Sequence, residues 1–175
     1  IMSSSPAAPN LALFGWSTRQ PGMGSLRPEM LRFARDLDLG ILLLRPGLSE
    51  IRPEVPKRID IWWRGLKNGA LMLLLAHLLT RNWEWKRSRV RILRVIPAGT
   101  DPAEAQAELE ELIRRSRIDV EPAVIASDES IAAVIDRESG DASLVMLGFE
   151  LPDPSAFPNW ADRLSALMPP HPDVV

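Results

Sequence analysis

The glycines near the amino terminus are the first residues whose type and spacing could support chemistry. Gly15, Gly22 and Gly24 lie between an apolar run at residues 11–16 and a helical pattern that begins at residue 28. In a doubly wound fold, glycines between a strand and a helix let the backbone approach a phosphate group. Because these three do not form a Gly-x-Gly-x-x-Gly pattern and their loop is long, we favour a plain surface loop over a phosphate site.

Metal and acid–base chemistry has few candidate residues. The chain contains no cysteine, which excludes disulfides, zinc–thiolate sites and thiol catalysis and fits an intracellular location. Of its two histidines, His77 lies in an apolar helical pattern, as expected of a core histidine with one hydrogen bond satisfied, and His171 lies in a proline-rich tail. No Ser-His-Asp arrangement or carboxylate pair stands out. We therefore expect no metal site, no cofactor and no catalytic residue.

Asp60 is a carboxylate inside the apolar run at residues 59–63. Burying a carboxylate costs free energy unless the group is paired. We expect Asp60 near the end of a strand, close to a backbone donor or to Arg58. A structural role is favoured over a catalytic one.

A basic cluster alternates with Trp83 and Trp85, a pattern that could contact nucleic acid or the inner leaflet of a membrane. Acidic residues of the next helical pattern could neutralise part of it, so a solvated, salt-bridged face is favoured. The whole chain has a net charge of −2 and offers no general attraction for nucleic acid. The basic residues are Arg81, Lys86, Arg87, Arg89, Arg91 and Arg94, and the acidic ones are Asp101, Glu104, Glu108, Glu110 and Glu111.

Strands and helices that could position these residues alternate along the chain. The strands are rich in β-branched residues or leucine and lack strict alternation, which is typical of a parallel sheet. The sequence predicts an α/β fold of three layers, a mostly parallel sheet with helices on both faces. Expected strands are residues 11–16, 41–44, 59–63, 89–96, 120–126 and 144–149, and expected helices are 28–37, 69–80, 102–117, 127–138 and 158–167.

The length of 175 residues suits one domain, which we place at residues 10–175 after a disordered or artificial tail at 1–9. Gly40 is expected at the end of the first helix, and Pro102 at the first position of the third. Both ends of the sequence look cut, so we expect a piece of a longer protein.

The helix expected at residues 69–80 is apolar on nearly every side. Its twelve residues would reach roughly 18 Å, whereas the hydrocarbon core of a bilayer is roughly 30 Å thick. His77 interrupts it and Arg81 closes it. We therefore expect a core helix packed between a sheet and another element, not a membrane span.

The middle of the chain resembles the cytosolic C-terminal domain of the cation–chloride cotransporters, the Na-K-Cl and K-Cl carriers. The residues that carry the resemblance are a paired-tryptophan strand, a leucine helix and the strands that follow. They are Pro9-Asn10, Ile59-Asp60-Ile61-Trp62-Trp63, the helix at 69–81, Trp85-Lys86, Arg89-Val90-Arg91-Ile92, Ser116-Arg117-Ile118-Asp119 and Ser143-Leu144-Val145-Met146-Leu147-Gly148. They occur in the family's order over roughly residues 9 to 168.

One departure from the family pattern is the loop at residues 64–69, Arg-Gly-Leu-Lys-Asn-Gly, where the family has an acidic Asp-Asp-Gly-Gly loop. Its charge is reversed, so no role of those carboxylates is carried over. The family's transmembrane bundle and the first half of its cytosolic domain are also missing from this sequence. We therefore expect this chain to bind no transported ion and no small-molecule substrate by itself.

The resemblance implies a fold similar to the universal stress proteins and a non-catalytic regulatory and dimerisation role. The parent would be an integral membrane protein that couples chloride to sodium or potassium without net charge movement, with this domain in the cytoplasm. Expected partners are a second copy, contacted through exposed aromatics such as Trp83 and Trp85, and the parent's own transmembrane domain, but no nucleic acid.

An alternative is a stand-alone module similar to the universal stress proteins that senses a nucleotide. That fold often binds ATP through a Gly-x-x-Gly loop after a late strand. Gly148 follows such a strand, but the next residues are Phe149-Glu150-Leu151-Pro152, with no second glycine. The sequence therefore predicts no bound nucleotide.

Overall fold

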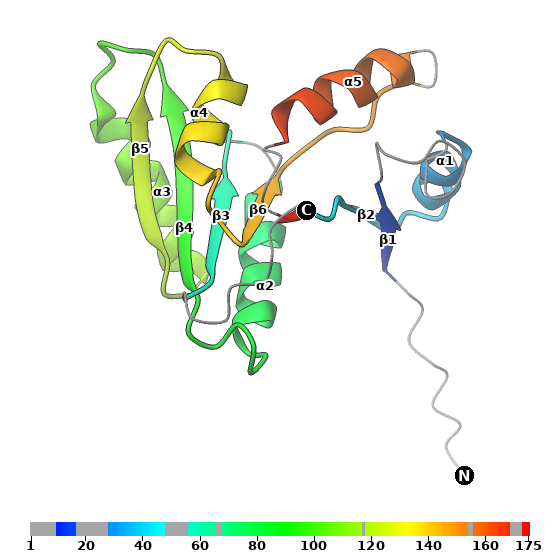
Figure 1. Ribbon diagram of the computed structural model, residues 1–175, viewed down its shortest axis with the longest axis horizontal. Helices are drawn as coiled ribbons and strands as arrows, with labels where there is room; N and C mark the ends of the chain where they lie inside the picture. The colour runs from blue at the N-terminus through cyan, green and yellow to red at the C-terminus, as the bar shows by residue number, and fades with distance from the viewer. Residues whose placement is uncertain are drawn as a thin grey trace.

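The computed structural model describes residues 10–16, 28–47, 56–65, 68–116, 118–153, 156–168 and 173–175. A five-stranded sheet in the order β5-β4-β3-β6-β7 organises most of them (Figure 1). Neighbouring strands in it are all parallel. Its strands are β3 (Arg58–Trp62), β4 (Arg89–Ile96), β5 (Glu121–Ala126), β6 (Leu144–Leu147) and β7 (Asp173–Val174).

Helices cover both faces of this sheet, which confirms the expected α/β class and its three layers. α2 (Gly69–Thr80) and α3 (Pro102–Ser116) lie on one face, and α4 (Ile131–Ser139) and α5 (Phe157–Leu167) lie on the other (Figure 1). Side chains of β3 alternate between these faces because successive residues of a strand point to opposite sides. Ile59 and Ile61 therefore join the core under α2 and α3, while Trp62 joins the core under α4 and α5.

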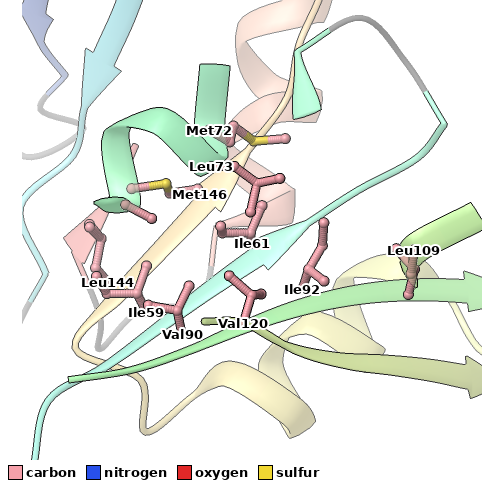
Figure 2. Close-up of a cluster of buried hydrophobic side chains, with 11 residues drawn as sticks. Ile59, Ile61, Met72, Leu73, Val90, Ile92, Leu109, Val120, Leu144 and Met146 are labelled. Carbon is pink, nitrogen blue, oxygen red and sulfur yellow. The ribbon is translucent and has the colours of Figure 1, made fainter. Parts of the chain in front are cut away.

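The larger core lies between the sheet and α2. Figure 2 shows Leu73 and Met72 of α2 above Ile59 and Ile61 of β3, with Ile92 of β4 beside them. Leu73, Ile61 and Ile92 are almost completely removed from water. Such burial stabilises the fold by roughly 2 kcal/mol for each large aliphatic side chain.

β1 (Leu11–Gly15) and β2 (Gly40–Leu44) form a separate two-stranded parallel sheet connected through α1 (Pro28–Asp36). The sequence suggested one continuous sheet, so this division is a difference from expectation. The small sheet meets the main sheet where Arg45 and Val174 exchange backbone hydrogen bonds of 2.9 Å. β7 is the main-sheet strand at this junction, and it is two residues long, so strand pairing does not continue across it. Leu43 of β2 also packs with Leu164 of α5.

The ends of two helices test the expected boundaries. Pro102 is the first residue of α3, as expected, and the Asp101 carboxylate accepts a hydrogen bond of 2.9 Å from the Ala103 N–H. The prediction for Gly40 is wrong, because Gly40 is the first residue of β2. Asp38 instead takes the left-handed conformation after α1, with φ of 55°, a position that aspartate adopts more readily than most residues.

In the described parts of the chain, no helix is long and apolar enough to cross a membrane. α2 does pack on the sheet as expected, with Met72, Leu73 and Ala76 buried. Its opposite side, however, leaves Leu74 51% and Leu78 58% exposed. We expected another element to pack on this opposite side of α2. Among the described residues, none covers Leu74 and Leu78.

Candidate functional site

The sheet order places a crevice at the carboxyl ends of β3 and β6. From β3 the chain crosses through α2 to β4 on one side, while β6 lies on the other side of β3. In open parallel sheets, ligands bind outside the strand ends at this reversal. Asn68 and Phe149 lie on the two sides of the reversal, and the Asn68 side-chain N–H donates to the Phe149 carbonyl oxygen at 3.1 Å.

Apolar side chains dominate this crevice, which has a volume of about 320 Å³. Arg64 and Arg94 are the charged residues that line it, and the guanidinium of Arg94 already has partners within the protein. The Arg94 guanidinium forms an ion pair with Glu108 and lies 5.3 Å from the centre of the Trp63 ring. The described lining residues include no acid, histidine, serine or lysine, so they offer no general base and no nucleophile. They are Trp62, Trp63, Arg64, Arg94, Val95, Ile131, Ile135, Leu147, Gly148, Leu164 and Leu167.

The glycines that could have held a phosphate do not form a cradle in the described residues. A Cβ added to Gly148 would make ordinary contacts of 3.6 Å or more, and one added to Gly15 would meet nothing within 4 Å. Neither position is therefore one that only glycine can fill. Gly22 and Gly24 lie outside the described residues, so the surface-loop interpretation of that segment stays a prediction.

Asp60 is the centre of a buried polar network on the α4 side of the sheet. It is fully buried and accepts hydrogen bonds from Arg91 Nε at 2.8 Å, the second Arg91 nitrogen at 2.7 Å, Ser139 Oγ at 2.7 Å and Arg58 Nε at 3.3 Å. The Trp62 indole N–H donates to Ser139 Oγ at 3.1 Å. Asp60 is thereby satisfied by structural partners, as a buried carboxylate requires.

The same two arginines close the carboxyl end of α4. Both Arg58 and Arg91 donate to the Glu138 carbonyl oxygen, at 3.1 Å and 2.9 Å. Positive charge at this end complements the helix dipole and satisfies a carbonyl that has no partner within the helix. Arg58 also pairs with Asp141 just beyond the helix. The network therefore links β3, β4 and α4.

Two pKa values reflect these contacts. The hydrogen bond to Asp60 raises the pKa of Arg91 above its ordinary value, with partial burial opposing the shift. The hydrogen bond from Arg58 lowers the pKa of the Asp141 carboxyl. Both shifts favour the charged forms that make the ion pairs.

The expectation for Asp60 was partly right. Arg58 is a partner and the role is structural, but Asp60 lies in the middle of β3. Its main partner, Arg91, was missed because it comes from the next strand, where the register places Arg91 opposite Asp60. A signal existed in the sequence: oppositely charged residues interrupt the apolar runs of two strands that neighbour each other, Asp60 in β3 and Arg91 in β4.

The basic cluster divides into paired and unpaired residues. Arg89 pairs with Glu121, Arg91 with Asp60 and Arg94 with Glu108, so the salt-bridged interpretation is confirmed for half of the cluster. Of the expected acidic residues, only Glu108 pairs with it. The remaining cations, Arg81, Lys86 and Arg87, are exposed and form no ion pair with the described residues.

The two tryptophans of this segment differ in exposure. Trp83 is 82% exposed, as expected. The prediction that Trp85 is exposed is wrong, because its ring packs against the main core and Lys57 Nζ lies 4.4 Å from the ring centre. We call the set Leu74, Leu78, Arg81, Trp83, Lys86 and Arg87 the α2 tip surface.

The histidines offer no metal site in the described structure. His77 lies half-buried near the end of α2, so it is not a member of the core, and His171 falls outside the described residues. No group of three potential ligands that could hold a metal ion occurs among the residues described.

Comparison with known proteins gives matches by fold and by sequence. A protein from the universal stress protein family of Burkholderia pseudomallei superposes with a TM-score of 0.44 at 15% identity, covering 71% of this chain and 97% of that one. The sequence profile of Solute carrier family 12 matches residues 52–134. "Potassium/chloride cotransporter 3" of Caenorhabditis elegans is 29% identical over 149 residues, which cover 74% of this chain.

The chain spans 13% of the length of that curated relative. The profile match runs from before β3 into α4, and so includes the paired tryptophans, the leucine helix and the Asp60–Arg91 pair. These matches agree with the motifs noted in the sequence. They show that this chain is similar to the cation–chloride cotransporters over most of its length.

Proposed function

We propose that this chain is a non-catalytic cytosolic regulatory and dimerisation domain of a cation–chloride cotransporter. The observation that carries the proposal is the alignment with a potassium/chloride cotransporter over 74% of the chain. The parent would couple chloride to potassium or sodium without net charge movement. The apolar crevice, with no base or nucleophile among its described lining residues, supports a role without catalysis.

Exposed apolar side chains in the region of β1 and α1 support dimerisation. Five large apolar side chains are exposed on β1, on α1 and at the residue directly after α1. β1 is also the edge of the small sheet, and an edge strand offers free backbone groups to a partner. We assign pairing with a second copy to the exposed apolar side chains of this region, which are Leu11, Leu13, Met30, Phe33 and Leu37.

Sedimentation over a range of concentrations tests the pairing. The wild type is expected to form a dimer, and Phe33→Asp is expected to weaken it by at least tenfold, because a central apolar contact is worth more than about 1.4 kcal/mol. Phe33 is 67% exposed, so the variant should still fold. Trp83→Asp is the matched control. A dimer lost with Trp83→Asp and kept with Phe33→Asp would move the interface to the α2 tip surface, and a strict monomer would contradict dimerisation by this chain.

The parent protein tests the transport assignment. Its gene is expected to encode about a dozen apolar spans of roughly 20 residues before this domain. Chloride-dependent uptake of a potassium or sodium tracer by the full-length protein is expected to fall with Phe33→Asp and to persist with Trp83→Asp. A gene without apolar spans would refute the proposal.

The crevice at the sheet reversal favours one alternative, a nucleotide-sensing module, because this is where such folds bind ligands. Addition of ATP separates the two functions. A rise of several degrees in the melting temperature at modest ATP concentration would support nucleotide sensing, since a ligand that binds only the folded state stabilises it. We expect no shift.

A further inference from the structure

The outward side of α2 carries leucines that the core does not use. Leu74 and Leu78 lie four residues apart and point away from the side on which Met72, Leu73 and Ala76 are buried. A surface helix ordinarily places polar residues on that side. The two leucines therefore form an apolar stripe that is open to a partner.

The turn that directly follows α2 adds a further exposed apolar side chain, Trp83. Asn82 accepts hydrogen bonds from the Glu84 and Trp85 N–H groups, both at 3.0 Å. Ser88 Oγ donates to the Trp85 carbonyl oxygen at 2.6 Å, and the Trp85 ring is anchored in the core. An ordered turn thus presents an 82% exposed indole.

Charge distinguishes between the possible occupants of this surface. Arg81, Lys86 and Arg87 are exposed and unpaired among the described residues, and Glu84 is the one acid in the same segment, 81–88. The segment is therefore positive in a chain whose net charge is −2. A second copy docked symmetrically would bring like charges together. A negatively charged bilayer surface would pair with the cations and accept the indole and leucines at headgroup depth.

We propose that the α2 tip surface docks on an anionic membrane surface. Trp83 and Leu78 enter the headgroup region, while Arg81, Lys86 and Arg87 contact lipid phosphates. The chain lies on the membrane and does not cross it. This contact uses only the surface of this chain, so it holds or fails independently of the proposed transporter role.

Co-sedimentation of the chain with vesicles tests the docking. Binding is expected to vesicles in which roughly a third of the lipid is phosphatidylserine, with little binding to pure phosphatidylcholine. Each cation removed should weaken binding about fivefold, so Arg81→Gln/Lys86→Gln/Arg87→Gln should lose on the order of a hundredfold. Trp83→Ala should lose several-fold, and added salt should weaken the wild type.

Matched variants elsewhere on the surface serve as controls. Phe33→Ala removes an exposed aromatic from α1, and Arg114→Gln/Arg115→Gln removes two exposed cations from α3. Both should bind vesicles like the wild type, and circular dichroism should show all variants folded. Equal binding to neutral and anionic vesicles, no binding to either, or equal losses in the control variants would overturn the proposal. So would a dimer that Trp83→Ala abolishes while vesicle binding is unchanged.

Discussion

Replacing Asp60 by asparagine removes the negative charge at the centre of the network that links β3, β4 and α4. The side chain is fully buried and accepts four hydrogen bonds, three of them from arginines. Asparagine has nearly the same shape but turns one acceptor into a donor that faces other donors. Both Arg91 and Arg58 then lose their central counter-charge.

Removal of one partner of a buried ion pair costs about 3–5 kcal/mol, because the other charge stays buried without compensation. The side chains of Arg91 and Arg58 keep 21% and 22% exposure and their contacts with the Glu138 carbonyl. Partial hydration should place the cost at the low end of this range. We expect Asp60→Asn to lower the free energy of unfolding by about 3 kcal/mol.

Urea unfolding at neutral pH, followed by far-UV circular dichroism, measures this loss. Glu121→Gln is the matched control, because Glu121 pairs with Arg89 of β4 at the surface and should cost less than about 1 kcal/mol. A cycle with Arg91→Met should show strong coupling to Asp60, because the two side chains share two hydrogen bonds. A loss for Asp60→Asn within about 0.5 kcal/mol of that for Glu121→Gln would refute the reasoning.

Three further changes test the packing and the charges. Leu73→Ala should lower the free energy of unfolding by about 2–5 kcal/mol because it empties a fully buried site. Leu74→Ala, one residue further on α2, should lower it by less than about 1 kcal/mol because Leu74 is exposed. Equal losses would contradict the orientation of α2 on the sheet. Gly69→Ala should lower the free energy of unfolding by about 1–3 kcal/mol, because the new Cβ would lie 2.7 Å from the indole nitrogen of Trp63. An unchanged melting curve would contradict that close contact. The lowered pKa of Asp141 means that its pair with Arg58 stabilises the fold above the unfolded pKa of about 3.9 and that this contribution disappears as the pH falls through the folded pKa. Asp141→Asn should therefore be less stable than the wild type at pH 7 and equally stable in strong acid, and an equal gap at both pH values would oppose this assignment.

Many features of the fold could be predicted because they depend on local periodicity. The helix at α2 and the strand at β3 are visible as apolar runs of different length, and Pro102 marks the start of α3. The resemblance of the paired tryptophans and leucine helix to the cation–chloride cotransporters was confirmed by the matches to that family. Gly40 shows the limit of local rules, because the turn after α1 uses Asp38 in the position where glycine is common.

The candidate sites depended on contacts between distant residues. By itself, the sequence determined that Asp60 must be paired, since a buried carboxylate requires a partner whatever the fold. Only the tertiary structure decided that Arg91 supplies the main contact, because the register between β3 and β4 places it there. It also decided which cations of the basic cluster are paired, and that Trp83 is exposed while Trp85 is partly buried against the core. These outcomes follow from how strands and helices pack across the chain, and the pattern of neighbouring residues does not contain that information.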